Sequence, residues 1–269
     1  MKLCLCFHCL CESYDDISGE SGELFVSLDD MRGLIDRLLT RGYTFSDLED
    51  TADNTVSITF DDGYANNLLF AELAHEYEIP YIVFVSAYYS QTGEGFPWMV
   101  PIGKNYEQMH QFNYYSHHQA RGDNSVLKPD TSQARPMTFD ELSDLAGTGL
   151  MEIGCHGYYH QPLSKEFERY MDDERTRSMS VFNEYLGVIP RYYALANGMY
   201  TGQVVRDLLK TFDKVLTIDG TAFRAKDKVI HRLSLTSPNT SAPLIDQIDQ
   251  SMRFARQVKR AIRTKRRLF

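Results

Sequence analysis

Short apolar runs alternate with amphipathic stretches along most of this 269-residue chain. The apolar runs have the length of strands, and the stretches between them repeat apolar residues at helical spacing. Such alternation predicts an α/β fold in which helices cover parallel strands. We predict strands at residues 3–8, 56–60, 81–87, 151–154, 192–196, 214–218 and 229–235. About seven strands in one chain of this length favour a (β/α) barrel of parallel strands over an open sheet.

Capping residues mark where two of the helices begin. Ser27 precedes a helix at 27–42, whose apolar residues recur every three to four positions. Thr138 and Glu141 form a capping-box pattern at the start of a helix at 138–149. Further helices are predicted at 66–77, near 164–186, near 201–210 and from about 243.

The chain contains no internal repeat and no linker, which predicts one barrel domain over residues 1–242. Residues 243–269 predict a basic amphipathic helix. This helix either packs on the barrel with a frayed basic end or lies on an anionic membrane surface. Residues 251–269 carry eight Lys or Arg and no Asp or Glu, although the whole chain has a net charge of −9. The rest of the chain is therefore strongly acidic, which argues against a nucleic-acid partner.

Five cysteines indicate the cellular compartment. Four of them, Cys4, Cys6, Cys9 and Cys11, lie close together near the N-terminus, at a spacing that does not match the usual zinc pairs. We interpret them as small buried residues of a core strand, and so many free thiols indicate a reducing compartment. The sequence shows no secretory signal and no membrane span. We expect a cytoplasmic protein, peripheral at the inner face of the membrane if the basic tail binds lipid.

Two constellations of polar residues follow predicted strands. Asp61 and Asp62 come directly after the strand at 56–60, at the end where catalytic groups gather in parallel folds. A common DDG turn would account for the same residues. His156 and His160 follow the strand at 151–154 and could present two imidazoles to one ion, or could be exposed loop residues. Together, one Asp and two His at strand ends predict a catalytic metal site with open positions.

The chain resembles the NodB-like polysaccharide deacetylases, carbohydrate esterase family 4. TFDDGY at 59–64 matches the first motif of that family, and CHGYYH at 155–160 matches its H-[ST]-x-x-H motif with Gly157 in the Ser/Thr place. The resemblance runs from about residue 3 to residue 235 and includes the FH pair that ends the first strand. It implies a distorted (β/α) barrel that uses one divalent metal, usually zinc, to remove the N-acetyl group from a sugar.

The resemblance also implies the roles of the motif residues. Asp61 matches the general base that activates the attacking water. Asp62, His156 and His160 match the three metal ligands. For the general acid, which protonates the leaving amine, His8 matches a pattern found in some branches of the family, and His231 is the rival candidate.

The third family motif, R-x-P-[YF]-G, is altered here. The aligned residues are Ala194-Leu195-Ala196-Asn197-Gly198, so the Arg that orients the catalytic Asp is missing. The backbone N–H of Asn197 could still stabilise the oxyanion. We hypothesise that Arg232, in the predicted strand at 229–235, replaces the missing Arg.

The predicted substrate contacts are Trp98 and Tyr64. Trp98 lies in residues 90–136, a long aperiodic stretch rich in aromatic residues, which we interpret as a lid or a platform for a sugar ring. The predicted function is metal-dependent de-N-acetylation of an N-acetylated glycan or glycan precursor. Two alternatives stay open: hydrolysis of a non-sugar amide, and glycan binding without turnover, which the altered third motif favours.

Overall fold

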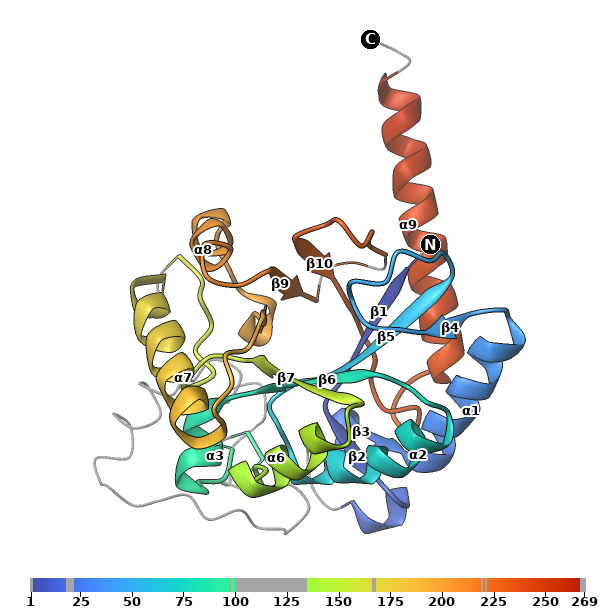
Figure 1. The fold of residues 1–269 in the computed structure, drawn as a ribbon. Coiled ribbons are helices and arrows are strands. Elements are labelled where there is room, and N and C mark those ends of the chain that lie inside the picture. The colour runs from blue at the N-terminus through green and yellow to red at the C-terminus, as the bar shows by residue number, and fades with distance from the viewer. Residues whose placement is uncertain are drawn as a thin grey trace.

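The computed structural model describes residues 2–17, 22–96, 98–99, 135–165, 168–218, 220 and 222–266. Parallel strands form one large sheet, and helices cover its outer side (Figure 1). The strands are β1 (Leu3–Phe7), β2 (Cys9–Cys11), β3 (Phe25–Ser27), β4 (Thr44–Phe45), β5 (Thr55–Phe60), β6 (Tyr81–Val85), β7 (Met151–Cys155), β8 (Tyr192–Ala194), β9 (Lys214–Thr217), β10 (Val229–His231) and β11 (Leu233–Ser234). All seven strands predicted from the sequence are found at or within a few residues of the expected positions.

The large sheet is almost closed into a barrel. Its spatial order is β10-β9-β8-β7-β6-β5-β1-β11, with β4 paired to β5, while β2 and β3 form a separate parallel pair. β10 pairs with β9, and β11 pairs with β1 at the opposite edge of the sheet. Because Arg232 alone separates β10 from β11, one segment of chain joins the two edges. The predicted distorted barrel is confirmed, and the predicted strand at 229–235 is divided in two at this arginine.

The helices are α1 (Leu28–Thr40), α2 (Phe70–Glu76), α3 (Ala87–Thr92), α6 (Phe139–Gly147), α7 (Met171–Leu186), α8 (Gly202–Leu208) and α9 (Leu244–Arg266). Both predicted caps are confirmed. The Ser27 side chain accepts a hydrogen bond from Asp30 N at the start of α1, and Thr138 and Glu141 form the capping box of α6. The helix predicted at 66–77 instead begins as a 3₁₀ helix over Ala65–Leu69. The strand predicted at 81–87 ends at Val85, where α3 follows.

Strand alternation divides the core into two layers. Leu3, Leu5 and Phe7 of β1 belong to the cluster that includes the buried residues of α1, so they lie between the sheet and the helices. Cys4 belongs to a second cluster, shared with Phe84, that contains no helical residue and therefore fills the barrel interior. The four N-terminal cysteines are all buried strand residues, as predicted.

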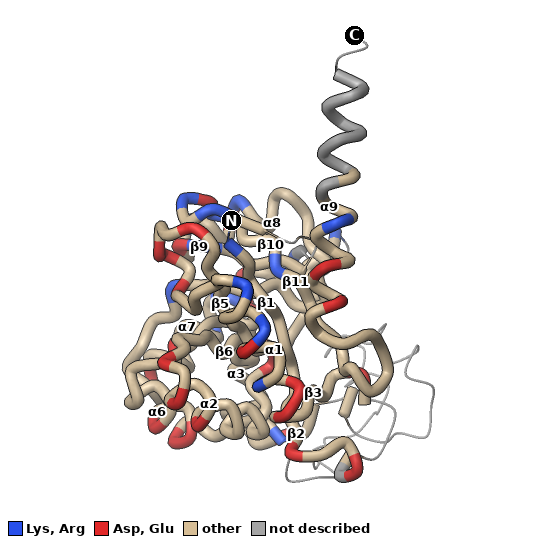
Figure 2. Tube along the Cα trace, turned by 90° about the vertical axis from the view of Figure 1, so that its right-hand side faces the viewer, with Lys and Arg blue, Asp and Glu red and all other residues tan. Residues whose placement is uncertain are grey.

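The first turns of α9 pack on the barrel. Leu244, Ile245 and Ile248 are buried in the main core, and Arg41, directly after α1, forms an ion pair with Asp249 at 2.9 Å. Beyond these turns the helix extends away from the barrel (Figure 1). Among the described residues, no helix is long and apolar enough to cross a membrane. Figure 2 shows acidic positions on α2 and α6 and both signs of charge on α9.

Candidate active site

The polar residues that the sequence singles out gather at the carboxyl ends of neighbouring strands. His8 follows β1, Asp61 and Asp62 follow β5, His156 follows β7, and the segment containing Asn197 follows β8. Because β1, β5, β6, β7 and β8 are consecutive and parallel, these ends lie along one rim of the barrel.

Asp62, His156 and His160 form a compact buried cluster. Asp62 Oδ1 lies 3.1 Å from His160 Nε2 and 3.4 Å from His156 Nε2. His156 Nδ1 lies 2.9 Å from the carbonyl oxygen of Ala194, which fixes this nitrogen as the proton donor. The Nε2 lone pair of His156 is thereby directed at the same carboxylate that His160 faces.

Left-handed backbone at two of these residues creates this arrangement. Asp62 has φ of 72° and His160 has φ of 58°, values that L-residues other than glycine seldom adopt. Gly63 continues the turn with φ of 86°, and a side chain there would press against Val85 at 3.3 Å. Such conformations persist where the surroundings hold them, and they concentrate at functional sites.

The donor set suits a divalent cation. Asp62 is 3% exposed, and its Oδ1 accepts no hydrogen bond from the residues that the structure describes. A buried carboxylate oxygen without a hydrogen bond is costly, whereas a cation between it and the two imidazoles would satisfy all three groups. Two nitrogens and one oxygen are ligands that zinc accepts. Although burial raises its pKa, the two histidines hold the pKa of Asp62 well below its usual range.

The neighbouring carboxylate, Asp61, already has a positive partner. Arg232 donates to Asp61 Oδ1 at 2.6 Å and to Oδ2 at 2.7 Å, and both side chains are buried. The same guanidinium donates to Thr59 Oγ1 at 3.1 Å. Burial raises the pKa of Asp61, but Arg232 and His156 outweigh it and lower the pKa to about 2. Asp61 is therefore ionised at neutral pH, and a bidentate ion pair with Arg232 holds it in one orientation.

A second group of candidate ligands, Cys6, His8 and Asp61, lies beside the first. Here the guanidinium of Arg232 occupies both oxygens of Asp61, so positive charge is already supplied. Burial also raises the pKa of the Cys6 thiol well above its usual value, which disfavours the thiolate that a metal requires. Of the two groups, the one around Asp62 therefore fits a divalent cation better.

His8 lies close to Asp61, with its nearest ring nitrogen within 4.8 Å of the carboxylate and of the Cys6 sulfur. The backbone of this segment is held by two asparagines: Asn67 donates to the carbonyl of His8 at 2.7 Å, and Asn66 accepts from Leu10 N at 3.1 Å. Sequence reasoning missed both asparagines, because an Asn pair after a turn gives no signal of a contact with another strand.

His231, the rival candidate for the general acid, lies on β10. Its Nδ1 is 2.9 Å from the hydroxyl of Thr217 on the adjacent strand β9. The structure therefore brings His8 to Asp61 and connects His231 to the neighbouring strand.

Asn197 is exposed in the turn after β8, with φ of 54°. Gly198 follows with φ of 61°, and a Cβ there would lie 2.6 Å from Ile218. The turn begins two residues after Ala194, whose carbonyl oxygen contacts His156, so Asn197 lies three residues from a contact of the candidate metal site.

Trp98 covers one side of the candidate metal site formed by Asp62, His156 and His160. Its ring centroid is 4.4 Å from that of His160, and its Nε1 donates to the hydroxyl of Tyr64 at 2.6 Å. Tyr64 is completely buried and packs on Phe96, whereas Trp98 is partly exposed. The structure thus brings both predicted substrate residues to the site, with Tyr64 beneath Trp98. Most of the predicted loop, residues 100–134, lies outside the described residues.

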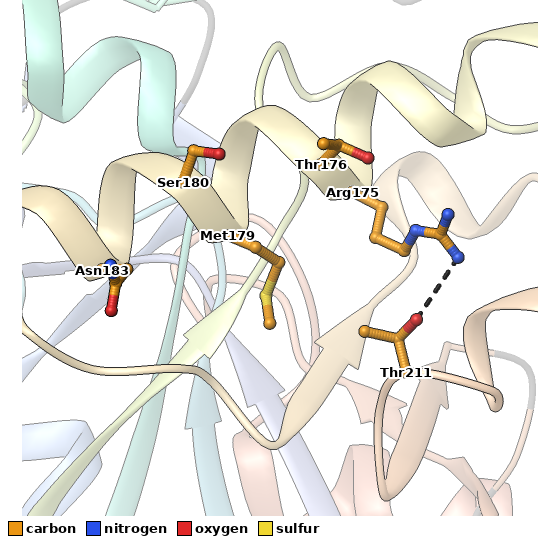
Figure 3. Close-up of a pocket in the computed structure, with 6 residues that line it drawn as sticks. All are labelled: Arg175, Thr176, Met179, Ser180, Asn183 and Thr211. Carbon is orange, nitrogen blue, oxygen red and sulfur yellow. Dashed lines mark hydrogen bonds between the residues drawn. The ribbon is translucent and has the colours of Figure 1, made fainter.

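An open groove lies elsewhere, between α7 and the turn after α8. Its volume is about 400 Å³, and Arg175 on α7 donates to Thr211 across it at 3.3 Å (Figure 3). It is lined by Arg175, Thr176, Met179, Ser180, Asn183 and Thr211. None of the residues around Asp61 and Asp62 lines this groove, so it is separate from the candidate active site.

Comparison with known proteins identifies the family. A family model described as polysaccharide deacetylase matches residues 48–212, more than half of the chain. The chain belongs to the polysaccharide deacetylase family. No curated protein matches it by sequence.

Several solved structures share the fold at low sequence identity. A de-N-acetylase from Aggregatibacter actinomycetemcomitans superposes with a TM-score of 0.66 and 15% identity, over 92% of this chain and 99% of that one. IcaB from Ammonifex degensii gives a TM-score of 0.64 and 19% identity, over 89% and 93% of the two chains. The deacetylase PplD from Streptococcus pyogenes, solved in complex with acetate, gives 0.62 and 15%, over 93% and 97%.

Proposed function

We propose that this protein is a metal-dependent de-N-acetylase that acts on an N-acetylated sugar of a glycan or glycan precursor. The observation that carries the proposal is the pairing of two buried carboxylates with different partners. Asp62 faces two histidines, while Asp61 is bound by Arg232. A hydrolase of this class needs one carboxylate for the metal and another for water.

The chain's own residues can supply each remaining step. A divalent ion held by Asp62, His156 and His160, most simply zinc, would polarise the acetamide carbonyl and lower the pKa of a water molecule. Asp61 accepts a proton from this water molecule while the water oxygen attacks the carbonyl carbon. Arg232 keeps the accepting oxygens in place, which is the role that the family's third motif gives to its Arg.

Collapse of the tetrahedral intermediate completes the reaction. The backbone N–H of Asn197 would stabilise the oxyanion. The bond between carbon and nitrogen then breaks, acetate is released, and His8 donates the proton that the leaving amine requires. His8 suits this role better than His231 because it lies beside Asp61.

The substrate class follows from the family and from Trp98. The partly exposed indole beside His160 provides an apolar surface on which a sugar ring can stack. Tyr64 supports Trp98 from below through its hydroxyl. Two of the similar structures, a de-N-acetylase and a deacetylase solved in complex with acetate, support removal of an acetyl group.

Glycan binding without turnover is the second candidate function. The observation that favours it is Ala194 and Ala196 in place of the Arg and Pro of the third motif. The ion pair between Asp61 and Arg232 argues for catalysis, because binding alone does not require a buried, oriented carboxylate beside a metal cluster. A non-sugar amide is a further possible substrate of the same machinery.

The metal content of the purified protein tests the proposal first. We expect about one equivalent of a divalent ion by mass spectrometry, lost in Asp62→Ala and His156→Ala and kept in His75→Ala, which replaces an exposed histidine of α2. Acetate release is then measured on N-acetylated glycan oligomers and on non-sugar amides. Metal binding without acetate release from any of them would favour the binding function, and release from the amides alone would overturn the sugar assignment.

We also propose that the protein is cytoplasmic and touches anionic membranes through α9. The first turns of the helix pack on α1, the projecting part begins near Phe254, which is 69% exposed, and residues 251–269 hold eight basic residues. The full chain should sediment with anionic liposomes but not with neutral ones. A variant lacking 256–269 that sediments equally well would refute the contact.

A further inference from the structure

Glu174 is a buried carboxylate that lies directly under the loop carrying His160. It is on α7 and is completely buried. Its two oxygens accept the backbone N–H of Tyr159 at 3.1 and 3.0 Å, and Oε2 also accepts the N–H of Gln161 at 3.3 Å. One side chain therefore anchors the peptide groups on both sides of a predicted metal ligand.

The residue at position 157 leaves space for this carboxylate. Gly157 has φ of 82°, and a Cβ there would collide with Glu174 Oε2 and lie 3.1 Å from the hydroxyl of Tyr193. The family motif has Ser or Thr at this position. The absence of a side chain at 157 and the presence of a carboxylate at 174 are thus two parts of one packing arrangement.

The conformation of His160 explains why the loop needs such an anchor. Its φ of 58° is unfavourable for a residue with a Cβ, so the loop keeps this shape only while other contacts hold it. The anchor is itself rigid, because α7 spans 16 residues and the hydroxyl of Ser178 donates to the backbone carbonyl of Glu174 one turn earlier.

We propose that Glu174 is a positioning residue of the metal site. Its carboxylate holds the loop in the strained shape that presents His160 Nε2 to Asp62, and together with Gly157 it replaces the Ser or Thr of the family motif. The proposal rests on the proposed function only in taking His160 as a metal ligand. It requires no turnover, so it can be tested without a substrate.

The first experiment measures backbone protection in the metal-free protein. By NMR, the amides of Tyr159 and Gln161 should exchange slowly in the wild type and much faster in Glu174→Ala, while the amides of β7 stay protected in both. Glu152→Gln, which replaces a partly exposed glutamate of β7 paired with Arg191, is the matched control and should change neither amide. Unchanged protection of both amides in Glu174→Ala would overturn the proposal.

The second experiment measures Co²⁺ binding by its visible absorption. Glu174→Ala should bind about tenfold to hundredfold more weakly than the wild type, with an altered spectrum, as expected when the support of a ligand is lost. Glu174→Gln keeps the shape of the side chain and one acceptor oxygen, so its Co²⁺ affinity should lie between those of the wild type and Glu174→Ala. It also keeps the test informative if Glu174→Ala does not fold. Equal affinity and an equal spectrum in all three proteins would contradict a positioning role.

A double-mutant cycle tests the link with Gly157. Gly157→Ser should displace Glu174 and weaken Co²⁺ binding, whereas in Glu174→Ala the serine has space and should weaken it less. Additive effects would refute the shared packing arrangement. If Co²⁺ binding depends on Glu174 but no substrate releases acetate, the proposed function fails while the positioning role stands. If acetate is released and Co²⁺ binding ignores Glu174, the opposite holds.

Discussion

The two halves of the active site handle buried charge in opposite ways. Around Asp61, the barrel supplies its own cation, since Arg232 binds both carboxylate oxygens from the segment that joins the sheet edges. Around Asp62, the chain supplies two histidines on left-handed loop backbone and leaves one oxygen without a hydrogen bond from the described residues. The first half is complete without a ligand, and in the proposed function a metal completes the second. The difference predicts that mutations in the two halves separate catalysis, folding and metal binding.

The largest expected effect is on catalysis at Asp61. Asp61→Asn keeps the shape but cannot take a proton, so kcat should fall about a thousandfold while metal content stays near wild type. Asp62→Asn should lose the metal and with it all measurable turnover. Acetate release and metal analysis on the same preparations check both. Loss of metal in Asp61→Asn would mean that the two halves are not separate.

The second-largest expected effect is on the free energy of unfolding, and it should occur in the half of the site around Asp61. Arg232→Met leaves Asp61 as a buried charge without its partner, which typically costs about 3–5 kcal/mol of unfolding free energy. Asp62→Asn in the metal-free protein should cost less than this, because Asp62 faces two histidines and has no counterpart to the two hydrogen bonds that Arg232 donates to Asp61. Urea denaturation with a chelator present compares the two variants. Adding Asp61→Asn to Arg232→Met should recover part of the loss, and a full further loss would argue against the ion pair.

Arg232→Ala also tests the hypothesis that this arginine replaces that of the third motif. If the protein still folds, kcat should fall while the metal is retained, since Asp61 keeps its charge but loses its orientation. Full activity with bound metal would refute the replacement.

The sequence predicts those parts of the fold and the site that short local patterns of residues determine. The capping box of Thr138 and Glu141, the strand preceding Asp61 and the strand preceding His156 were all visible as short patterns. The ion pair partner of Asp61 lies 171 residues away, so only the resemblance to a family with an orienting arginine suggested it. The pattern of residues 229–235 indicated one strand, because nothing local marks the point where the chain leaves one sheet edge for the other.

Other parts of the site gave no sequence signal at all. Glu174 is one of several acidic residues at the start of α7, and only its burial distinguishes it from its exposed neighbours Asp172 and Asp173. The left-handed backbone of Asp62 and His160 is equally hidden, since neither residue type requires it. These features depend on tertiary contacts, and sequence periodicity does not report such contacts.

The pH dependence of the unfolding free energy tests the Asp62 half of the site, where Glu174 supports the loop of His160. Burial raises the pKa of Glu174 to about 7, above the usual 4.5, although backbone N–H groups partly oppose the shift. A raised carboxyl pKa favours the folded state at low pH, and this contribution is lost as the pH rises from about 4.5 to about 7. The loss corresponds to about 3 kcal/mol, from 1.36 kcal/mol per pKa unit.

The side chain introduced by Glu174→Gln cannot ionise, so the unfolding free energy of this variant should not fall in this way as the pH rises. The unfolding free energies of the metal-free wild type and Glu174→Gln are compared from pH 4 to pH 8. Because the histidines titrate in both proteins, the difference curve reports mainly Glu174. A flat difference curve would show that Glu174 keeps an ordinary pKa and that its N–H donors offset burial.

The smallest expected effect is the stabilisation that metal brings to the Asp62 half. An ion that binds only the folded chain adds about 2.7 kcal/mol when its free concentration is a hundred times Kd. The wild type and Asp61→Asn should both gain this stability on addition of zinc, because both keep Asp62, His156 and His160. Asp62→Asn should gain almost none, since the negative charge that the ion would neutralise is gone. Thermal unfolding with and without zinc measures all three proteins, and His75→Ala controls for binding to exposed histidines. An equal gain in Asp62→Asn would place the ion elsewhere and remove the contrast between the two halves.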